Sequence, residues 1–213
     1  MDIVLPCLDE AAALPWVLDR IPPQARAIVV DNGSRDGSAQ LARDRGALVV
    51  ECGRRGYGAA CHAGLEAATA EFVMFCDCDA SLDPAVATQF VAALEAGADL
   101  VVGRRVPAER GAWSLSSRFA NRELARRVRA RTGLSLRDIG PVRAARRAPL
   151  LALPIADRRS GYPVETVLRA VQAGWAVQEL DVAYLPRAGR SKVTGTLRGT
   201  VQAVRDMSAV LAS

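Results

Sequence analysis

The 213-residue sequence lacks several features that would place it in a specialised class of protein. No apolar run approaches the ~18–20 residues of a membrane-spanning helix, and the apolar run between Asp2 and Asp9 is too short for a secretory signal. Internal repeats and low-complexity tracts are also absent. Because 50% of the residues are hydrophobic and 24% are charged, we expect a soluble, cytoplasmic protein with a single domain over residues 1–213.

The sequence also lacks the patterns typical of disulfide frameworks and structural zinc sites. Its five cysteines are an odd number without regular spacing, which favours reduced thiols in a cytosolic protein. Cys76 and Cys78 lie two residues apart, but a structural zinc site usually needs four ligands in two close pairs, and His62 is the one histidine. We therefore exclude a structural zinc site.

Positive charge, in contrast, is in excess and unevenly distributed. The formal net charge is +5. Ten arginines lie in one segment: Arg118, Arg122, Arg126, Arg127, Arg129, Arg131, Arg137, Arg143, Arg146 and Arg147. This concentration indicates an anionic partner such as a nucleotide phosphate or a lipid headgroup, although a solvated arginine-rich surface explains it equally well. Since aromatic residues do not alternate with the basic ones, we expect no nucleic-acid partner.

The first half of the chain alternates between apolar strands and helices. The pattern predicts strands over residues 2–6, 27–31, 47–51, 71–79 and 99–103. It predicts helices over residues 10–21, 38–45, 56–68 and 84–97. Near-continuous apolar strands separated by helices indicate an α/β fold with a mostly parallel central sheet and helices on both faces.

Beyond residue 103 the pattern is less regular. It predicts a loop over residues 104–117, a helix over 118–131, a turn with a short strand and helix over 138–153, a helix over 161–174 and an edge or return strand over 175–186. From Leu197 onward the spacing of apolar residues predicts an amphipathic helix. The apolar positions of that helix are Val201, Val204, Met207 or Ser208, and Leu211.

Two acids follow the apolar run in FVMFCDCDAS, residues 72–81. Residues two apart on a strand share one face, so Asp77 and Asp79 would repel each other unless a cation or hydrogen bonds lay between them. Mg²⁺ and Mn²⁺ often take only one or two carboxylates, with water and substrate phosphates as the other ligands. The pair is therefore a candidate metal site at the carboxyl end of a strand, although two acids at the start of a surface loop are common.

A series of motifs in fixed order gives this pair a context. The motifs are VLPCLDEAAALPWVL, IVVDNGSRDGS, GYGAACHAGL, FCDCDAS, LVVGRR, DIGPVRAARR, SGYPVETVLRAVQAG and YLPRAGRSKVTGT. Together they resemble the family-2 glycosyltransferases with the Rossmann-like GT-A fold, in the branch similar to dolichyl-phosphate mannose synthase and other polyprenyl-phosphate glycosyltransferases. The resemblance implies that residues 1–105 bind the nucleotide sugar and that residues 106–213 form the acceptor side.

The resemblance also implies roles for individual residues. Asp77 and Asp79 would bind the metal ion, and Asp79, Glu165 and Arg104 would act in catalysis, with Arg105 as an alternative source of positive charge. The residues expected to contact the nucleotide sugar are Pro6, Asp9, Glu10, Asp31, Gly33, Ser34, Gly58, Asp77, Arg187, Ser191 and Lys192. Simpler interpretations exist for three of these groups. Glu165 opens a helix, the segment around Asp31 fits an Asx-type turn, and Arg187 to Lys192 fit a solvated basic loop.

The expected activity is metal-dependent, inverting transfer of a hexose from a donor of the UDP-glucose or GDP-mannose type, with Mg²⁺ or Mn²⁺. The acceptor is either a polyprenyl phosphate at a membrane surface, with the protein bound peripherally, or a small soluble hydroxyl compound. A nucleotidyltransferase usually has a glycine-rich signature with a lysine after the first strand, and PCLDE offers neither. A non-catalytic anion-binding module would explain the arginines but not the acids at strand ends.

Overall fold

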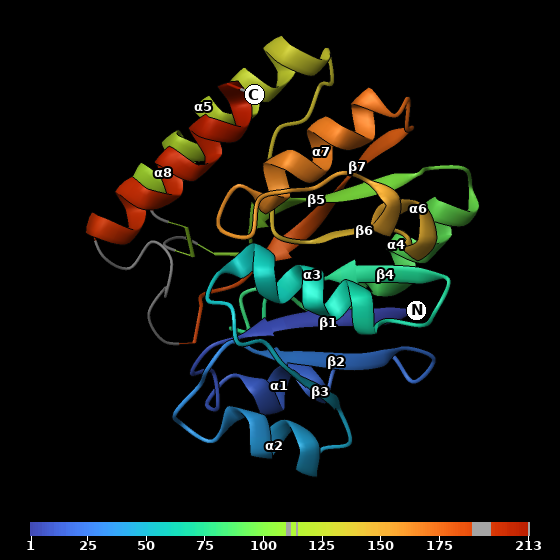
Figure 1. Ribbon diagram of the computed structural model, residues 1–213, viewed down its shortest axis with the longest axis vertical. Helices are drawn as coiled ribbons and strands as arrows, with labels where there is room; N and C mark the ends of the chain where they lie inside the picture. Colours follow the sequence, from blue (N-terminus) through green and yellow to red (C-terminus); the bar gives the residue numbers. More distant parts are fainter. Residues whose placement is uncertain (110–111, 114, 189–196, 213) are drawn as a thin grey trace.

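The computed structural model describes residues 1–109, 112–113, 115–188 and 197–212. Within them a seven-stranded sheet lies between two layers of helices (Figure 1). The strand order is β3-β2-β1-β4-β6-β5-β7, and every pairing is parallel except those of β6 with its two neighbours. The predicted α/β class with a mostly parallel sheet is therefore confirmed.

The first half supplies one edge and the centre of the sheet. Its strands are β1 (Asp2–Cys7), β2 (Arg26–Asp31), β3 (Leu48–Glu51) and β4 (Phe72–Phe75). Its helices are α1 (Leu14–Leu18), α2 (Ser38–Asp44), α3 (Tyr57–Ala67) and α4 (Ala87–Glu95), the last preceded by the short 3₁₀ helix η1 (Pro84–Val86). The helix predicted over residues 10–21 is shorter, because residues 11–13 form a turn and the chain leaves the helix before Pro22 and Pro23.

The second half completes the sheet and covers it. Its strands are β5 (Leu100–Pro107), β6 (Arg143–Arg146) and β7 (Val177–Tyr184). Its helices are α5 (Leu115–Thr132), α6 (Arg147–Ala152), α7 (Tyr162–Gln172) and α8 (Leu197–Ala212). The loop predicted from residue 104 is wrong at its start, because β5 pairs in parallel with the whole of β7 and so continues to Pro107.

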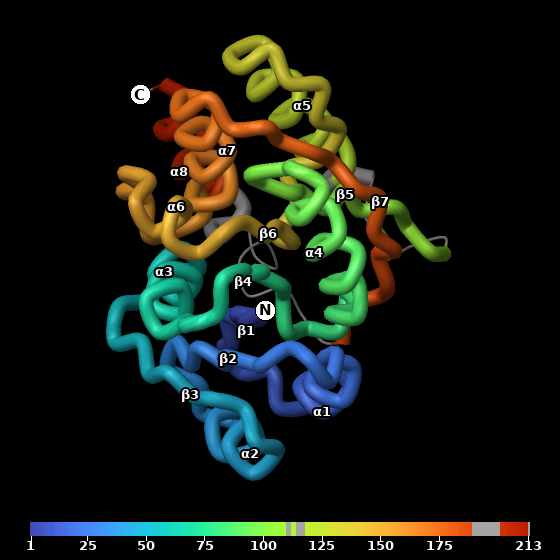
Figure 2. The backbone as a smooth tube through the Cα atoms, turned by 90° about the vertical axis from the view of Figure 1, so that its right-hand side faces the viewer, coloured from blue at the N-terminus to red at the C-terminus, as the bar shows by residue number. Residues whose placement is uncertain are grey.

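The alternation of side chains along the strands explains the two helical layers (Figure 2). Val4, Ile28 and Val30 point to one face and pack in a core with residues of α3, α6 and α7. Ile3 and Leu5 point to the other face, into a core that includes residues of α1, α2 and α4. Both faces of the sheet are therefore covered, as the continuous apolar strands predict.

The C-terminal helix forms, and of its predicted apolar positions Met207 and Leu211 pack against the core, whereas Val201 and Val204 do not. Ala203 and Val210 are buried, whereas Val201 and Val204 are 49% and 52% exposed. Phe119 on α5 is also 75% exposed. Both α5 and α8 thus present apolar side chains to solvent, and the two helices meet at their C-terminal ends, where Arg131 donates to the carbonyl of Leu211.

Candidate active site

The carboxyl ends of β1, β2, β4, β5 and β7 lie on one side of the molecule, to the left in Figure 1. This follows from the parallel pairing, and from β6, which runs antiparallel to both β4 and β5 and so keeps those two strands aligned. Ligands of open α/β sheets bind at this side. The loops that follow these strands therefore form the candidate site.

Asp77 and Asp79 lie in the loop after β4 and not on the strand itself, so the strand predicted to residue 79 is too long. The strand ends at Phe75, and Asp79 Oδ1 accepts the N–H of Ser81 at 3.0 Å in a tight turn. Ala80 has a φ of +61°, which ends any extended path. Asp79 is buried and Asp77 is partly buried, so both acids are held at the carboxyl end of β4, as predicted, but by loop geometry.

The segment after β7, residues 185–188, is joined to the loop of Asp77 and Asp79 by hydrogen bonds and an ion pair. Arg187 Nη2 lies 2.7 Å from Asp79 Oδ2, and the N–H of Ala188 donates to the Asp79 carbonyl at 2.9 Å. The N–H of Leu185 donates to the Ser81 carbonyl at 2.9 Å. The structure therefore brings Arg187 and Asp79 together, as the predicted site requires. Ser191 and Lys192 lie outside the described residues.

The electrostatic environment of Asp77 disfavours its ionised form. Burial raises the pKa of Asp77 from 3.8 to about 6, and repulsion from Asp79 acts in the same direction. The positive charges of Arg187, Arg105 and Arg143 lower this pKa without cancelling the rise. Ionised Asp77 is therefore in an unfavourable position that a bound cation would relieve.

Among the described residues, no three His, Cys, Asp or Glu side chains are arranged to enclose a metal ion. The two aspartates supply at most a half-shell of hard oxygen ligands. Mg²⁺ and Mn²⁺ accept such a half-shell when substrate phosphates and water provide the remaining ligands. The residues present thus fit a metal ion that binds together with a phosphorylated substrate.

Of the two arginines at the end of β5, the structure favours Arg105 over Arg104. Arg104 Nη2 forms an ion pair with Asp181 Oδ2 on β7 at 2.6 Å. Arg105 points to the opposite face, where it makes two 2.8 Å hydrogen bonds to buried Asp138 and lies 4.3 Å from the ring centroid of Trp113. The positive charge of Arg105 also lowers the pKa of Asp77, so Arg105 is the better candidate for the positive charge near the acids.

The loops that follow β1 and β2 are hydrogen-bonded to each other. Asp31 accepts the N–H groups of Gly33 and Ser34 at 3.3 and 3.2 Å, which forms the Asx-type turn that the sequence allowed. The N–H of Asp9 donates to Ser34 Oγ at 2.9 Å, and Asp9 Oδ1 accepts the N–H of Arg35 at 2.7 Å. These predicted donor-binding residues are therefore gathered at one place, with their side chains engaged in shaping the two loops.

The remaining predicted donor-binding residues have structural partners as well. The carbonyl of Pro6, within β1, accepts a hydrogen bond from Cys78 Sγ at 2.9 Å, and the N–H of Glu10 donates to Ser38 Oγ at 2.9 Å. A Cβ atom at Gly58 would lie 2.7 Å from the Cβ of Tyr162. The absence of a side chain at Gly58 is therefore required by the packing of α7 on α3, and its contact with a nucleotide stays a prediction.

Glu165 has the environment of a structural residue. Its carboxylate accepts the N–H groups of Ala156 and Asp157 at 3.0 and 2.6 Å and pairs with Arg169 at 3.1 Å. The side chain is buried, with only 6% of its surface exposed. Glu165 thus holds the segment before α7 in place, which favours the structural interpretation over a role as general base.

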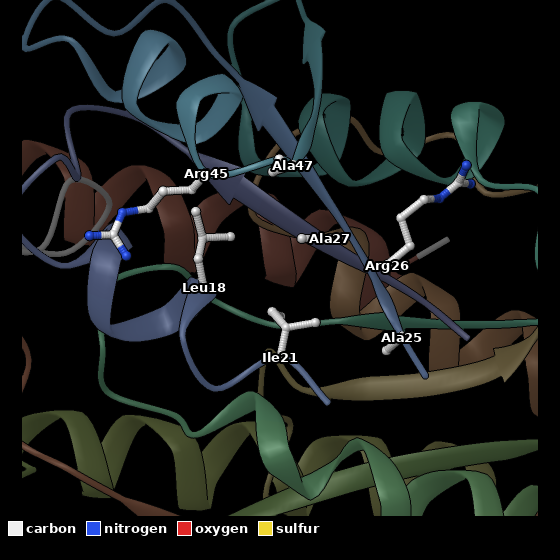
Figure 3. Close-up of a pocket in the computed structure, with 8 residues that line it drawn as sticks. Leu18, Ile21, Ala25, Arg26, Ala27, Arg45 and Ala47 are labelled. Carbon is white, nitrogen blue, oxygen red and sulfur yellow. The ribbon is translucent and has the colours of Figure 1, made fainter. Parts of the chain in front are cut away.

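One hollow lies away from these loops, near the amino ends of β2 and β3 (Figure 3). Its volume is about 250 Å³, and its lining includes Leu18, Ile21 and Ala27. The charged groups of Arg26 and Arg45 point away from it and pair with Asp2 and Asp19. The hollow therefore offers no convergent polar groups for chemistry.

The structure also draws attention to Arg143, which the sequence analysis named only as one of many arginines. The guanidinium lies in the core, next to Phe75 and close enough to Asp77 to influence its pKa. In the sequence it is an arginine between the apolar residues Val142 and Ala144, at the start of the short strand β6. Arginine is almost never fully buried without a partner, so such a position calls for a specific explanation.

Comparison with known proteins agrees with this geometry. The family model described as "Glycosyl transferase family 2" matches residues 2–152. An uncharacterized glycosyltransferase of Mycobacterium tuberculosis is 49% identical over 210 residues, covering 98% of this chain and 96% of that protein. A dolichyl-phosphate hexose transferase of Haloferax volcanii is 28% identical over 194 residues, covering 90% of this chain and 85% of that protein.

A solved structure extends the similarity to the fold. Glucosyl-3-phosphoglycerate synthase from Mycobacterium tuberculosis, in complex with Mn²⁺, UDP and phosphoglyceric acid, is similar with a TM-score of 0.79 and 26% identity. The similarity covers 99% of this chain and 76% of that one. The resemblance found in the sequence motifs is therefore confirmed, and this chain belongs to glycosyltransferase family 2.

Proposed function

We propose that this chain is an inverting, metal-dependent glycosyltransferase that transfers a hexose from a nucleoside-diphosphate sugar to a phosphate-bearing acceptor, preferentially a polyprenyl phosphate. The observation that carries this proposal is the group of Asp77, Asp79, Arg105 and Arg187 at the carboxyl end of the sheet. Acids and arginines in one place suit a reaction that brings a divalent cation and several phosphates together. Family membership leaves the nucleotidyltransferase and the non-catalytic module without support.

Asp77 and Asp79 would hold Mg²⁺ or Mn²⁺. The ion would neutralise the charge that develops on the leaving diphosphate. In the present structure Asp79 Oδ2 is paired with Arg187, so Arg187 must release this oxygen before it can serve as a metal ligand. Arg187 would then be free to contact a donor phosphate, because it sits on the segment that is bonded along the same loop.

The chemistry of the acceptor decides whether a base is needed. An acceptor oxygen attacks the anomeric carbon of the sugar, and the bond from that carbon to the diphosphate oxygen breaks, with the electron pair leaving on the diphosphate. A hydroxyl acceptor must lose a proton in this step, whereas an ionised phosphate acceptor has none to lose. Since the Glu165 carboxylate is already occupied by two backbone N–H groups and Arg169, Glu165 is poorly suited to act as that base, which supports an acceptor that needs none.

The similar proteins support an acceptor that carries phosphate. One is named a dolichyl-phosphate hexose transferase, and the synthase was crystallised with phosphoglyceric acid. The two compounds share a phosphate group, one on a lipid and the other on a small soluble acid. A small phosphorylated acid is therefore the second candidate acceptor.

The helices that follow β5 and β7 favour the lipid. Exposed arginines line α5, whose single acid is Glu123, and Phe119 stands exposed beside Arg118 near the start of that helix. On α8, Val201 and Val204 are exposed. Exposed apolar side chains among positive charges suit the surface of an anionic bilayer. Within the described residues, no helix is both long and apolar enough to span a membrane, so we propose peripheral binding.

Two experiments test the proposal. Thermal unfolding with Mn²⁺ and either UDP-glucose or GDP-mannose should show a large rise in melting temperature with one donor, since a ligand stabilises the state that binds it. Transfer should then be measured with polyprenyl phosphate in anionic vesicles and, separately, with 3-phosphoglycerate. Transfer to the lipid alone supports the preferred acceptor, transfer to the glycerate alone supports the second, and no stabilisation by any sugar nucleotide would contradict the proposal.

A further inference from the structure

Arg143 is an ionised group inside the protein core. Its side chain on β6 is 1% exposed. Nη1 donates to the Pro141 carbonyl at 3.0 Å, and Nη2 lies 3.9 Å from Cys61 Sγ. The guanidinium stands 4.8 and 5.4 Å from the ring centroids of Phe75 and Tyr162. Arginine stays protonated in proteins, so a full positive charge is buried between two aromatic rings.

This charge has no carboxylate partner within ion-pair distance in the described part of the chain. Two buried polar atoms of its neighbourhood, Arg143 Nε and Tyr162 Oη, also make no hydrogen bond to described residues. Burying an ion without such compensation destabilises a fold. The Pro141 carbonyl and the two aromatic rings offset part of this cost, but no opposite charge does.

The location of Arg143 supplies an explanation. Antiparallel pairing of β4 and β6 places Arg143 opposite Phe75, two residues before Asp77. The same pairing places Arg146 opposite Phe72, over whose ring its guanidinium lies at 5.3 Å. Arg146, at the end of β4 away from the acids, is 37% exposed and lies 3.6 Å from Glu71. Of these two otherwise similar arginines, only the one beside the acids is buried without a carboxylate.

We propose that Arg143 is a positioning residue for the sugar nucleotide, acting through its fixed positive charge beneath the loop of Asp77 and Asp79. This inference rests on the proposed function, because it assumes that a nucleoside diphosphate binds at that loop. A diphosphate adds negative charge next to two carboxylates, and a buried cation that cannot move offsets it without reorganisation. Because the charge is away from solvent, its effect is stronger and less screened by salt than that of a surface arginine.

The test compares Arg143→Met, Arg143→Lys and the matched control Arg146→Met. Binding of UDP and of GDP, each with Mn²⁺, is measured by calorimetry, and stability is measured by urea denaturation. Arg143→Met should weaken binding of the preferred diphosphate about tenfold or more, at both about 50 mM and about 500 mM salt. Its stability should equal or exceed that of the wild type, because an apolar side chain of similar volume replaces a buried charge.

The other variants separate charge from packing. Arg143→Lys should retain most of the affinity, and Arg146→Met should bind as the wild type does, although it removes the same charge from the same strand. Should Arg143→Met fail to fold, Arg143→Gln removes the charge and keeps a donor that can reach the Pro141 carbonyl.

Two outcomes would overturn the inference. Wild-type affinity in the folded neutral variant would overturn the role of Arg143 alone, and so would an equal loss in Arg146→Met. A wild-type protein that binds neither diphosphate would overturn the proposed function together with this inference.

Discussion

Replacing Asp77 by asparagine should make the metal-free protein more stable. Burial and repulsion from Asp79 raise the pKa of Asp77 from 3.8 to about 6. One pKa unit corresponds to about 1.4 kcal/mol, so keeping this carboxylate ionised at pH 7 costs the folded state up to about 3 kcal/mol. Since Asp77 retains some contact with solvent, we expect Asp77→Asn to raise the free energy of unfolding by about 1–3 kcal/mol.

The sign of the pH dependence follows from the direction of the shift. A carboxyl group with a higher pKa in the folded state takes up protons preferentially in that state. Its contribution to the stability of the wild type therefore falls as the pH rises from about 4 to about 6. Asparagine has no such dependence, so the advantage of Asp77→Asn should be full at pH 7 and should vanish near pH 4.

Urea denaturation in EDTA at these two pH values measures the effect. Asp44→Asn, at an exposed position on α2, removes the same charge and should change the stability by less than about 0.5 kcal/mol. The reasoning would be refuted if Asp77→Asn were less stable than the wild type at pH 7. An equal gain at both pH values would also refute it, because the gain would then not come from ionisation.

Further predictions concern activity and surface binding. Asp79→Ala should abolish sugar transfer while the circular dichroism spectrum stays that of the wild type; near wild-type turnover, with EDTA harmless, would contradict this. Arg187→Gln should weaken donor binding about tenfold or more by calorimetry, because the ion pair of Arg187 with Asp79 at 2.7 Å shows that its side chain reaches the site. Glu165→Gln should lower the free energy of unfolding by about 1–3 kcal/mol and leave kcat nearly unchanged, since its carboxylate accepts backbone N–H groups; a loss of kcat without a loss of stability would instead identify a base. Phe119→Asp should reduce co-sedimentation with anionic vesicles more than Ala130→Asp does on the same helix; equal effects would show that charge alone, and not insertion of the apolar ring, is measured.

The sequence predicted the first half of the fold well because its information is local. Apolar runs such as that of β2, and turn signals such as Pro22 and Gly46, are read within a few residues. The pairing of β5 with β7 joins positions 77 residues apart, for example Arg104 and Asp181. A pattern within a few residues cannot predict such a pairing. The prediction therefore ended this strand at residue 103 and began a loop at residue 104, whereas β5 continues to Pro107.

For the candidate site, the sequence indicated that Asp77 and Asp79 lie at the carboxyl end of a strand. It did not indicate the backbone conformation or the hydrogen bonds that position them. Asp77 and Asp79 were found from their spacing, yet they lie in a turn that ends at Ser81. Whether the side chain of Arg104 or that of Arg105 lies on the face of the acids depends on the register of β5 in the sheet. A shift of one residue in this register exchanges the faces of the two side chains. Arg143 was missed because its importance arises only from its pairing opposite Phe75.

The account depends most on a divalent cation bound by Asp77 and Asp79 together with a diphosphate. Electron paramagnetic resonance of Mn²⁺, titrated with UDP and GDP, tests this directly in the wild type and in Asp77→Asn and Asp79→Asn. We predict a protein-bound Mn²⁺ signal in the wild type that strengthens with one of the two nucleotides and is lost in both variants. Undiminished Mn²⁺ and nucleotide binding in the two variants would contradict the account.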